Sequence, residues 1–167
     1  GEAPERMIVI ETAQDAEKVQ PPDPNQVAYL TQTTLSLDDT SEIIKILKQR
    51  FPNIEGPPKD DICYATQNRQ NAVKELASQV DRILVVGASN SSNTLRLVEV
   101  AKAQGTEARR VEEASQIEKA DVEGVKSIGI SAGASAPEDV VQSIVAKLCE
   151  LAPQNNVREL KLVDENV

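Results

Sequence analysis

The chain of 167 residues contains no histidine and no tryptophan, and it has only one phenylalanine, two tyrosines and two cysteines. Without an imidazole it lacks the side chain most often used as a general base near neutral pH, which limits the chemistry it can perform alone. Its cysteines, Cys63 and Cys149, lie far apart and make no disulfide framework, so we expect a reducing compartment. Because aromatics are scarce, Leu, Ile and Val must form the core, which favours an α/β fold over a sandwich or barrel.

Positive charge is also scarce: 18 Lys and Arg stand against 27 Asp and Glu, a formal charge of −9. This balance argues against a nucleic-acid surface, which needs a basic face to neutralise phosphates, and it disfavours anionic membranes. No apolar run reaches membrane-spanning length, and no signal-peptide pattern opens the chain. The composition remains compatible with an enzyme that binds one small anion through local dipoles.

What the chain does have is a repeated local pattern, an apolar strand followed by a loop of small polar residues and then a helix. The pattern occurs as YLTQTTLSLDDT at 29–40, ILVVGASNSSNT at 83–94 and IGISAGASAPED at 128–139. Such a unit directs unpaired backbone N–H groups and side-chain donors at one spot, where a phosphate can bind. If the strand ends converge, the loops form a pocket for a small, doubly phosphorylated molecule.

The first half of the chain is interrupted by proline-rich segments. The expected elements are a buried strand at 6–11, a helix at 13–20, a break at 21–25, a strand at 26–34 and a helix with apolar positions from Ile43 to Phe51. Asp38, Asp39 or Thr40 can cap this second helix. A further helix follows Cys63, with Arg69 on the side that also carries several alanines.

From residue 80 onward, strands and helices alternate regularly. Strands are expected at 82–87, 108–113 and 126–133, and helices at 94–104, 115–123 and 137–151. The second of these strands is the weakest, and Gly105 is expected to end the helix before it. Continuous apolar strands that alternate with helices predict a parallel sheet covered on both faces.

The loop at 88–93 contains the densest cluster of donors, Ser91, Ser92 and Asn93. An ordinary helix N-cap explains an isolated cluster of this kind, but the two sibling loops at strand ends favour a ligand site. The loop is neither a Walker loop nor a dinucleotide fingerprint, because the required Gly-Lys and glycine-triplet patterns are missing. Ser135 fits a capping box with Glu138, and its hydroxyl could equally face a phosphate.

Of three further residues, Thr33 and Cys63 have two readings each. Thr33 is a strand residue that could also present its hydroxyl at the end of the sheet. Cys63, at the start of a helix, could be a thiolate and a soft metal ligand, or an inert thiol. Cys149 follows the apolar stripe of the last helix, and we expect it in the core.

Four motifs, in this order, closely resemble those of the LytB-type 4-hydroxy-3-methylbut-2-enyl diphosphate reductase family, which closes the methylerythritol phosphate route to isoprenoids. They are TQTTLSLDDT, KDDICYATQNRQ, VVGASNSSNTLRL and SAGASAPE. The resemblance runs from about Arg6 to Leu151. It implies an α/β fold of parallel-sheet strand–helix units, which are part of a three-unit trefoil around an iron–sulfur site.

The resemblance also implies roles for single residues. Cys63 corresponds to the last of three cysteines on a [4Fe-4S] cluster, and Thr33 to a residue of the proton-delivery network near the substrate alcohol. Ser91, Ser92, Asn93 and Ser135 correspond to the diphosphate donors. The implied reaction is a two-electron reductive removal of the allylic hydroxyl, which yields isopentenyl and dimethylallyl diphosphates with electrons from ferredoxin or flavodoxin.

The chain departs from the family because the other two cluster cysteines, three substrate-binding histidines and the acidic proton donor are missing. We therefore expect the C-terminal portion of the reductase: an incomplete second α/β unit at 1–79, a complete third unit at 80–152 and a tail at 153–167. This portion is expected to be inactive alone, with the cluster absent or incomplete, and to need the missing N-terminal part as a partner. A bacterial cytoplasmic location is expected, with a plastid as the alternative.

Two other classes of function remain open on the residues alone. A non-enzymatic phosphate-binding α/β module, resembling sugar-phosphate isomerase domains, would use the same serine loops. A plain interaction domain would use its serines only as helix caps and would bind no anion.

Overall fold

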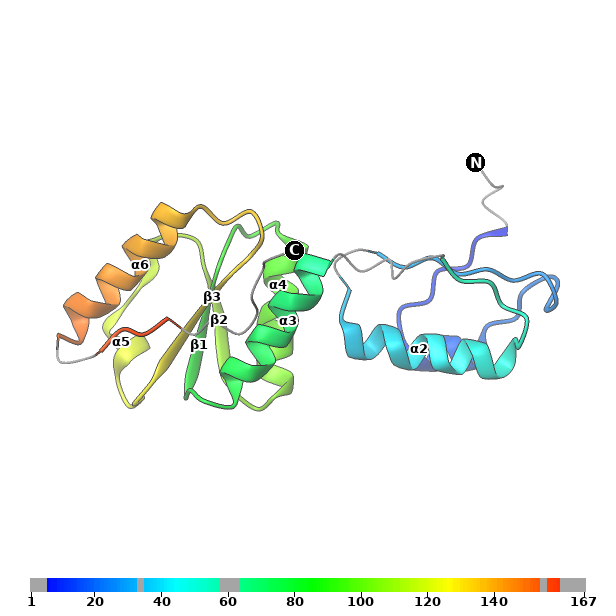
Figure 1. Ribbon diagram of the computed structural model, residues 1–167, viewed down its shortest axis with the longest axis horizontal. Helices are drawn as coiled ribbons and strands as arrows, with labels where there is room; N and C mark the ends of the chain where they lie inside the picture. Colours follow the sequence, from blue (N-terminus) through cyan, green and yellow to red (C-terminus); the bar gives the residue numbers. More distant parts are fainter. Residues whose placement is uncertain (1–5, 33–34, 58–63, 154–155, 160–167) are drawn as a thin grey trace. The chain divides into compact units, whose positions relative to one another are not determined.

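The computed structural model describes residues 6–32, 35–57, 64–153 and 156–159 (Figure 1). The chain forms two compact units, 1–63 and 64–167. None of the described helices is long and apolar enough to span a membrane.

The first unit is built on two helices, α1 (Ala13–Lys18) and α2 (Leu37–Arg50). Its core places Leu47 and Phe51 against Ala16, with partly buried isoleucines and valines around them. Arg50 ties the helices together, because its guanidinium donates to the carbonyls of Ala16 and Val19 at the end of α1. The expected helix at 13–20 and the apolar stripe of α2 are confirmed.

The prediction of two strands in this unit is wrong for the residues that the structure describes. Residues 7–11 form no strand, and Met7 and Val9 are 62% and 82% exposed. Residues 26–32 contribute only an isolated parallel bridge, from Ala28 to Glu55. A strand is stable only beside a hydrogen-bonded neighbour, and a two-stranded contact is marginal by itself. The predicted cap of the second helix is also wrong. Ser36 is the N-cap of α2, and its hydroxyl oxygen accepts a hydrogen bond from Asp39 N at 3.4 Å.

The second unit is a three-stranded parallel sheet with helices on both faces, as the sequence predicted. The strands are β1 (Arg82–Val86), β2 (Glu107–Val111) and β3 (Ile128–Ala132), in the order β2-β1-β3. Helices α3 (Tyr64–Ala77) and α4 (Ser92–Ala103) cover one face. The other face is covered by α6 (Glu138–Leu151) and by two short helices, η2 (Ala114–Gln116) and α5 (Lys119–Val122) (Figure 1).

The central strand β1 organises the core of this unit. Ile83 and Val85 face α3 and α4, whereas Leu84 and Val86 face α6, because successive side chains of a strand point to opposite faces. All four are 0% exposed, as expected for a strand flanked on both edges and covered on both faces.

Helix α3 belongs to the compact unit of the sheet, which begins at Tyr64 rather than at residue 80. Leu76 packs so closely over β3 that a Cβ at Gly129 would collide with it. The division at residue 79 follows the family's repeated units and stays a prediction about the parent protein. Cys149 is only half-buried, because α6 turns Ile144 and Leu148 toward the sheet instead.

Candidate functional site

Three helices begin at the edge of the sheet where the strands end. Helices α4 and α6 follow β1 and β3 directly. Helix α3 runs antiparallel to the strands, since Leu76 lies over Gly129 near the start of β3 and Arg69 bonds to Ala132 at its end. The first turns of α3 and α4 contain no acidic residue, so their positive dipole ends are not neutralised from within the helix.

Backbone hydrogen bonds join the strand ends into one surface. Gly87 N donates to Val111 O at 3.0 Å, and Gly133 N donates to Val86 O at 2.8 Å. A Cβ at either Gly87 or Gly133 would collide with the hydroxyl of Thr94, which is 1% exposed. Glycine is therefore required at both positions by close approach, and Thr94 brings the loops after β1 and β3 together.

Ser91 and Ser92 begin α4 at this edge. Ser91 is the N-cap: its hydroxyl oxygen accepts from Thr94 N at 3.2 Å and from the Thr94 hydroxyl at 2.9 Å. Ser92 is the first residue of the helix and is exposed. Ser91 is thus a structural cap, and the reading of a helix cap is correct for this residue. Within the described residues its hydroxyl acts only as an acceptor.

Asn93 is the most unusual residue of the site. It is 8% exposed, and neither its side-chain oxygen nor its side-chain nitrogen has a hydrogen-bond partner within the described structure. An unpaired buried amide costs about 1–3 kcal/mol, and native proteins retain few of them. Its position in the first turn of α4 makes this amide a candidate donor to a ligand.

Ser135 does not cap α6, so the predicted capping box with Glu138 is wrong. The N-cap is Pro137, and no side chain caps the helix. The reason is the turn after β3, in which Ala136 N donates to Gly133 O and delays the start of the helix. Ser135 is exposed and has no hydrogen-bond partner in the described part of the chain, so its hydroxyl is free to bind a ligand.

Arg69 is a candidate site residue that the sequence reasoning missed. It donates from Nη1 to the Ala132 carbonyl at 3.1 Å, while its Nε is buried without a partner. In contrast, Arg96 and Arg110 each pair with a carboxylate, Glu99 and Glu112. Arg69 has no such partner among the described residues, so it is a candidate source of positive charge at the edge where α3 and α4 begin. An arginine on the alanine side of a predicted helix was the available signal.

Two predicted site residues, Thr33 and Cys63, lie outside the described residues. The other four predicted site residues follow β1 and β3 at the carboxyl edge of the same sheet. They are Ser91, Ser92, Asn93 and Ser135.

The residues of this chain do not fit a complete four-iron cluster. Such a cluster is held by cysteine thiolates, and the sequence contains only Cys63 and Cys149. Cys149 lies in the last turn of α6, whereas α6 begins at the carboxyl edge. No group of three potential metal ligands gathers among the described side chains.

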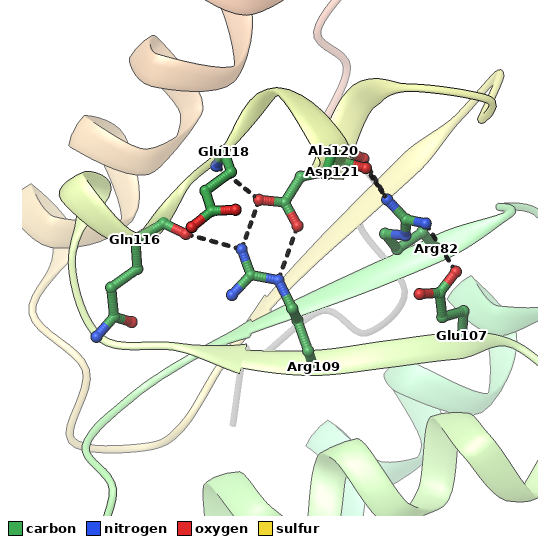
Figure 2. Close-up of a pocket in the computed structure, with 7 residues that line it drawn as sticks. All are labelled: Arg82, Glu107, Arg109, Gln116, Glu118, Ala120 and Asp121. Atoms are coloured by element: carbon green, nitrogen blue, oxygen red, sulfur yellow. Dashed lines mark hydrogen bonds and ion pairs between the residues drawn. The ribbon is translucent and has the colours of Figure 1, made fainter.

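A cavity of about 390 Å³ lies at the other end of β1 and β2, away from the predicted site (Figure 2). Its two guanidinium groups are each paired with a carboxylate, although the Nε of Arg82 is buried without a partner among the described residues. Arg109 forms two hydrogen bonds with Asp121, of 2.7 and 2.5 Å, and Arg82 binds Glu107 at 2.8 Å and the carbonyls of residues 120 and 121. These contacts fasten α5 to the edge of the sheet, so we interpret the cavity as structural.

The pKa values of the pair agree with this interpretation. Burial raises the pKa of Asp121, but hydrogen bonds from Arg109 and from the Glu118 amide outweigh it and leave the pKa below its ordinary value. The hydrogen bond with Asp121 raises the pKa of Arg109. Both groups stay charged, each as the partner of the other.

The chain matches the model of the LytB protein family over residues 1–149. It is 50% identical over 161 residues to the 4-hydroxy-3-methylbut-2-enyl diphosphate reductase of Aeromonas salmonicida, covering 96% of this chain and 51% of that protein. The corresponding enzyme of Acidithiobacillus ferrooxidans is 56% identical over 142 residues, with 85% of this chain and 45% of that protein covered.

Among solved structures, the E-1-hydroxy-2-methyl-but-2-enyl-4-diphosphate reductase of Plasmodium falciparum matches with a TM-score of 0.78 and 36% identity, over 84% of this chain and 44% of that chain. The chain spans about half the length of the curated relatives it matches, as expected for a C-terminal portion. The family match, the identities and the α/β fold together show that this chain belongs to the LytB family.

Proposed function

We propose that this chain is the C-terminal portion of a 4-hydroxy-3-methylbut-2-enyl diphosphate reductase and that its second unit supplies the donors for the diphosphate group. The observation that carries the proposal is the Asn93 amide, buried and unpaired in the first turn of α4. A phosphate oxygen at this point would satisfy the amide and would lie at the positive end of the helix dipole.

Each residue then has a task in binding. The Asn93 amide and the hydroxyls of Ser91 and Ser92 donate to one phosphate group, and Ser135 donates from the facing loop. Arg69 offsets part of the negative charge through the electrostatic field at this edge. Neutral donors hold and orient the diphosphate, which places the allylic end of the substrate in the parent protein's reaction site.

The reaction of the parent consumes two electrons and two protons. One proton and the electrons replace the allylic C–O bond by a C–H bond, and the other proton leaves with the hydroxyl as water. Thr33 is proposed to belong to the proton-delivery path and Cys63 to be one of three ligands of a [4Fe-4S] cluster, which would supply the electron transfer. Ferredoxin or flavodoxin is the proposed electron donor, and a bacterial cytoplasmic location is part of the same proposal.

Calorimetry with the chain tests the binding function directly. The allylic diphosphate substrate and inorganic diphosphate are expected to bind more tightly than ribose 5-phosphate. Asn93→Ala is expected to weaken diphosphate binding by about 1–3 kcal/mol, the cost of a lost buried donor to a charged group. Asn90→Ala is the matched control, because Asn90 lies in the same loop but is exposed.

Two results would contradict the proposal. Tighter binding of the sugar phosphate would favour the non-enzymatic phosphate-binding module. No binding of any anion, with Asn93→Ala folding normally by circular dichroism, would favour an interaction domain in which the serines act only in capping.

We also infer that the chain by itself cannot complete the catalytic cycle, because one proposed cluster thiolate cannot retain a four-iron cluster. Anaerobic iron–sulfur reconstitution, followed by the charge-transfer absorbance of the cluster, tests this inference. The absorbance is expected to disappear on desalting. A stable cluster with reductase activity in the chain alone would refute it.

A further inference from the structure

The loop that carries the predicted donors is held from the neighbouring strand by two charged side chains. Arg110 on β2 donates from Nη1 to the Gly87 carbonyl at 3.3 Å and forms an ion pair of 2.9 Å with Glu112 Oε1. The same Glu112 oxygen accepts a hydrogen bond from Ser89 N. The pair therefore contacts both ends of the turn from Gly87 to Ser89, which is separated from the N-cap Ser91 by one residue.

The carboxylate of Glu112 is unfavourable at an edge that is proposed to bind an anion, so its presence there calls for a local role. Glu112 lies where an anion is expected to bind, and like charges repel. It is kept as an anion, because the hydrogen bond from the Ser89 amide, with a smaller contribution from the charge of Arg110, lowers the pKa of Glu112. Arg110 neutralises its charge toward the surroundings.

Neither side chain is needed for the core. The side chains of Arg110 and Glu112 are 27% and 35% exposed, so they lie at the rim of the sheet. Their contacts in this part of the chain reach the loop backbone rather than the apolar clusters of the sheet. What they determine is the path of the loop between the end of β1 and the start of α4.

We propose that Arg110 and Glu112 are positioning residues for the diphosphate site. They hold the turn from Gly87 to Ser89 so that Ser91, Ser92 and Asn93 face one point before the ligand arrives. A loop that is already ordered loses less conformational freedom on binding, so the same donors give higher affinity. The inference rests on the proposed function, because it assigns these residues a role in that site.

Two substitutions of Glu112 separate positioning from charge. Glu112→Gln keeps an oxygen that can accept from Ser89 N but removes the negative charge, whereas Glu112→Ala removes both. With inorganic diphosphate as the calorimetric probe, Glu112→Ala is expected to weaken binding about tenfold, the loss that follows when a loop must be ordered on binding. Glu112→Gln is expected to retain the affinity within about twofold or to improve it, since a repulsive charge is gone.

The matched control is Glu113→Ala, which removes the same charge from the adjacent, exposed position. It is expected to leave the affinity unchanged. The alternative is that Glu112 competes with the ligand for the Ser89 amide. In that case Glu112→Ala would bind diphosphate more tightly than the unaltered chain. Equal or tighter binding by Glu112→Ala would overturn the proposal.

A readout without ligand keeps the two proposals distinguishable. In NMR spectra of the free chain, Glu112→Ala is expected to speed hydrogen exchange at the Ser89 amide and to shift the signals of Ser91 to Asn93, while Glu112→Gln restores both. Unchanged signals in Glu112→Ala would refute the positioning role whatever the affinity. Normal loop signals with no diphosphate binding by the unaltered chain would refute the proposed function instead.

Discussion

The two ends of the same three-stranded sheet differ in how their polar groups are satisfied. At the amino end, the guanidinium groups of Arg82 and Arg109 pair with Glu107 and Asp121 around a cavity of about 390 Å³ (Figure 2). One nitrogen there, Nε of Arg82, is buried without a partner among the described residues, but its guanidinium is otherwise bonded. At the carboxyl end, the amide of Asn93 is buried without a partner within the described residues.

This difference favours the carboxyl end as the candidate binding site, because neither polar atom of the Asn93 side chain has a partner among the described residues. Donors that already have acceptors stabilise the fold and gain little from a ligand, because the ligand would first have to displace those acceptors. Donors that are buried without acceptors lower the stability of the free protein and regain that free energy only when a ligand arrives. The presence of a hollow is a weaker guide here than the state of the hydrogen-bonding groups.

The largest expected effect that separates the two ends is the loss of stability on breaking the Asp121 contacts. Asp121→Ala is expected to lower the free energy of unfolding by about 1.5–3 kcal/mol, the range for hydrogen bonds to charged groups. The Arg109 side chain is 38% exposed, which places the effect toward the lower end. Urea denaturation measures it.

Asp121→Asn is the matched variant, because it keeps one acceptor oxygen and should lose less stability. Diphosphate affinity is expected to be unchanged in both variants. If either Asp121 variant kept its stability but bound diphosphate more weakly, the amino end rather than the carboxyl end would be the binding end.

A smaller effect separates two serines at the carboxyl end itself. Ser91→Ala removes the N-cap of α4 and is expected to cost about 1 kcal/mol of stability. Ser135→Ala removes an exposed hydroxyl that caps no helix, so its effect on stability should stay within about 0.5 kcal/mol. Both variants are expected to weaken diphosphate binding. A stability loss in Ser135→Ala equal to that in Ser91→Ala would show that Ser135 has a structural role.

The smallest expected effect is the response to acid. A carboxylate whose pKa is lower in the folded state stabilises the fold above its unfolded-state pKa, about 3.9 for Asp. That contribution is lost as the pH falls toward the folded-state pKa. Asp121 is such a group, and so is Asp81, whose pKa is lowered by hydrogen bonds from the Lys126 and Ser127 amides.

Urea midpoints between about pH 5 and pH 3 should therefore fall, and they should fall less steeply in Asp121→Ala. Only part of the Asp121 population is protonated in this range, so the effect is modest. The serine and asparagine donors at the carboxyl end do not titrate there, whereas Glu112 at that end, whose pKa is also lowered, contributes to the fall equally in both proteins. An identical slope in the variant would show that the Arg109 pair does not contribute to acid sensitivity.

Local patterns in the sequence predicted most of the second unit. The apolar run from Ile83 to Val86 predicted a fully buried strand. Gly105, with a φ of 85°, follows the end of α4 as expected. Both features depend on interactions within a few residues or on burial on both faces of a strand, so they are readable from the chain. The motif SNSSN likewise placed Ser91, Ser92 and Asn93 at a strand end.

Features that depend on distant neighbours could not be predicted in the same way. The segment at residues 6–11 has the composition of a strand, but it forms none because no partner strand pairs with it among the described residues. The cap expected at Ser135 failed because a turn after β3 delays the start of α6.

The sequence by itself therefore determined the strand–helix order of the sheet unit, the family and the residue types available to bind a diphosphate. Only the tertiary structure decided that, among the described residues, Asn93 is buried without a partner and Arg69 has no carboxylate beside it, and that Arg110 and Glu112 hold the loop after the neighbouring strand. The reason is that hydrogen-bond satisfaction depends on which atoms from remote segments come within about 3 Å, and no local pattern encodes that distance.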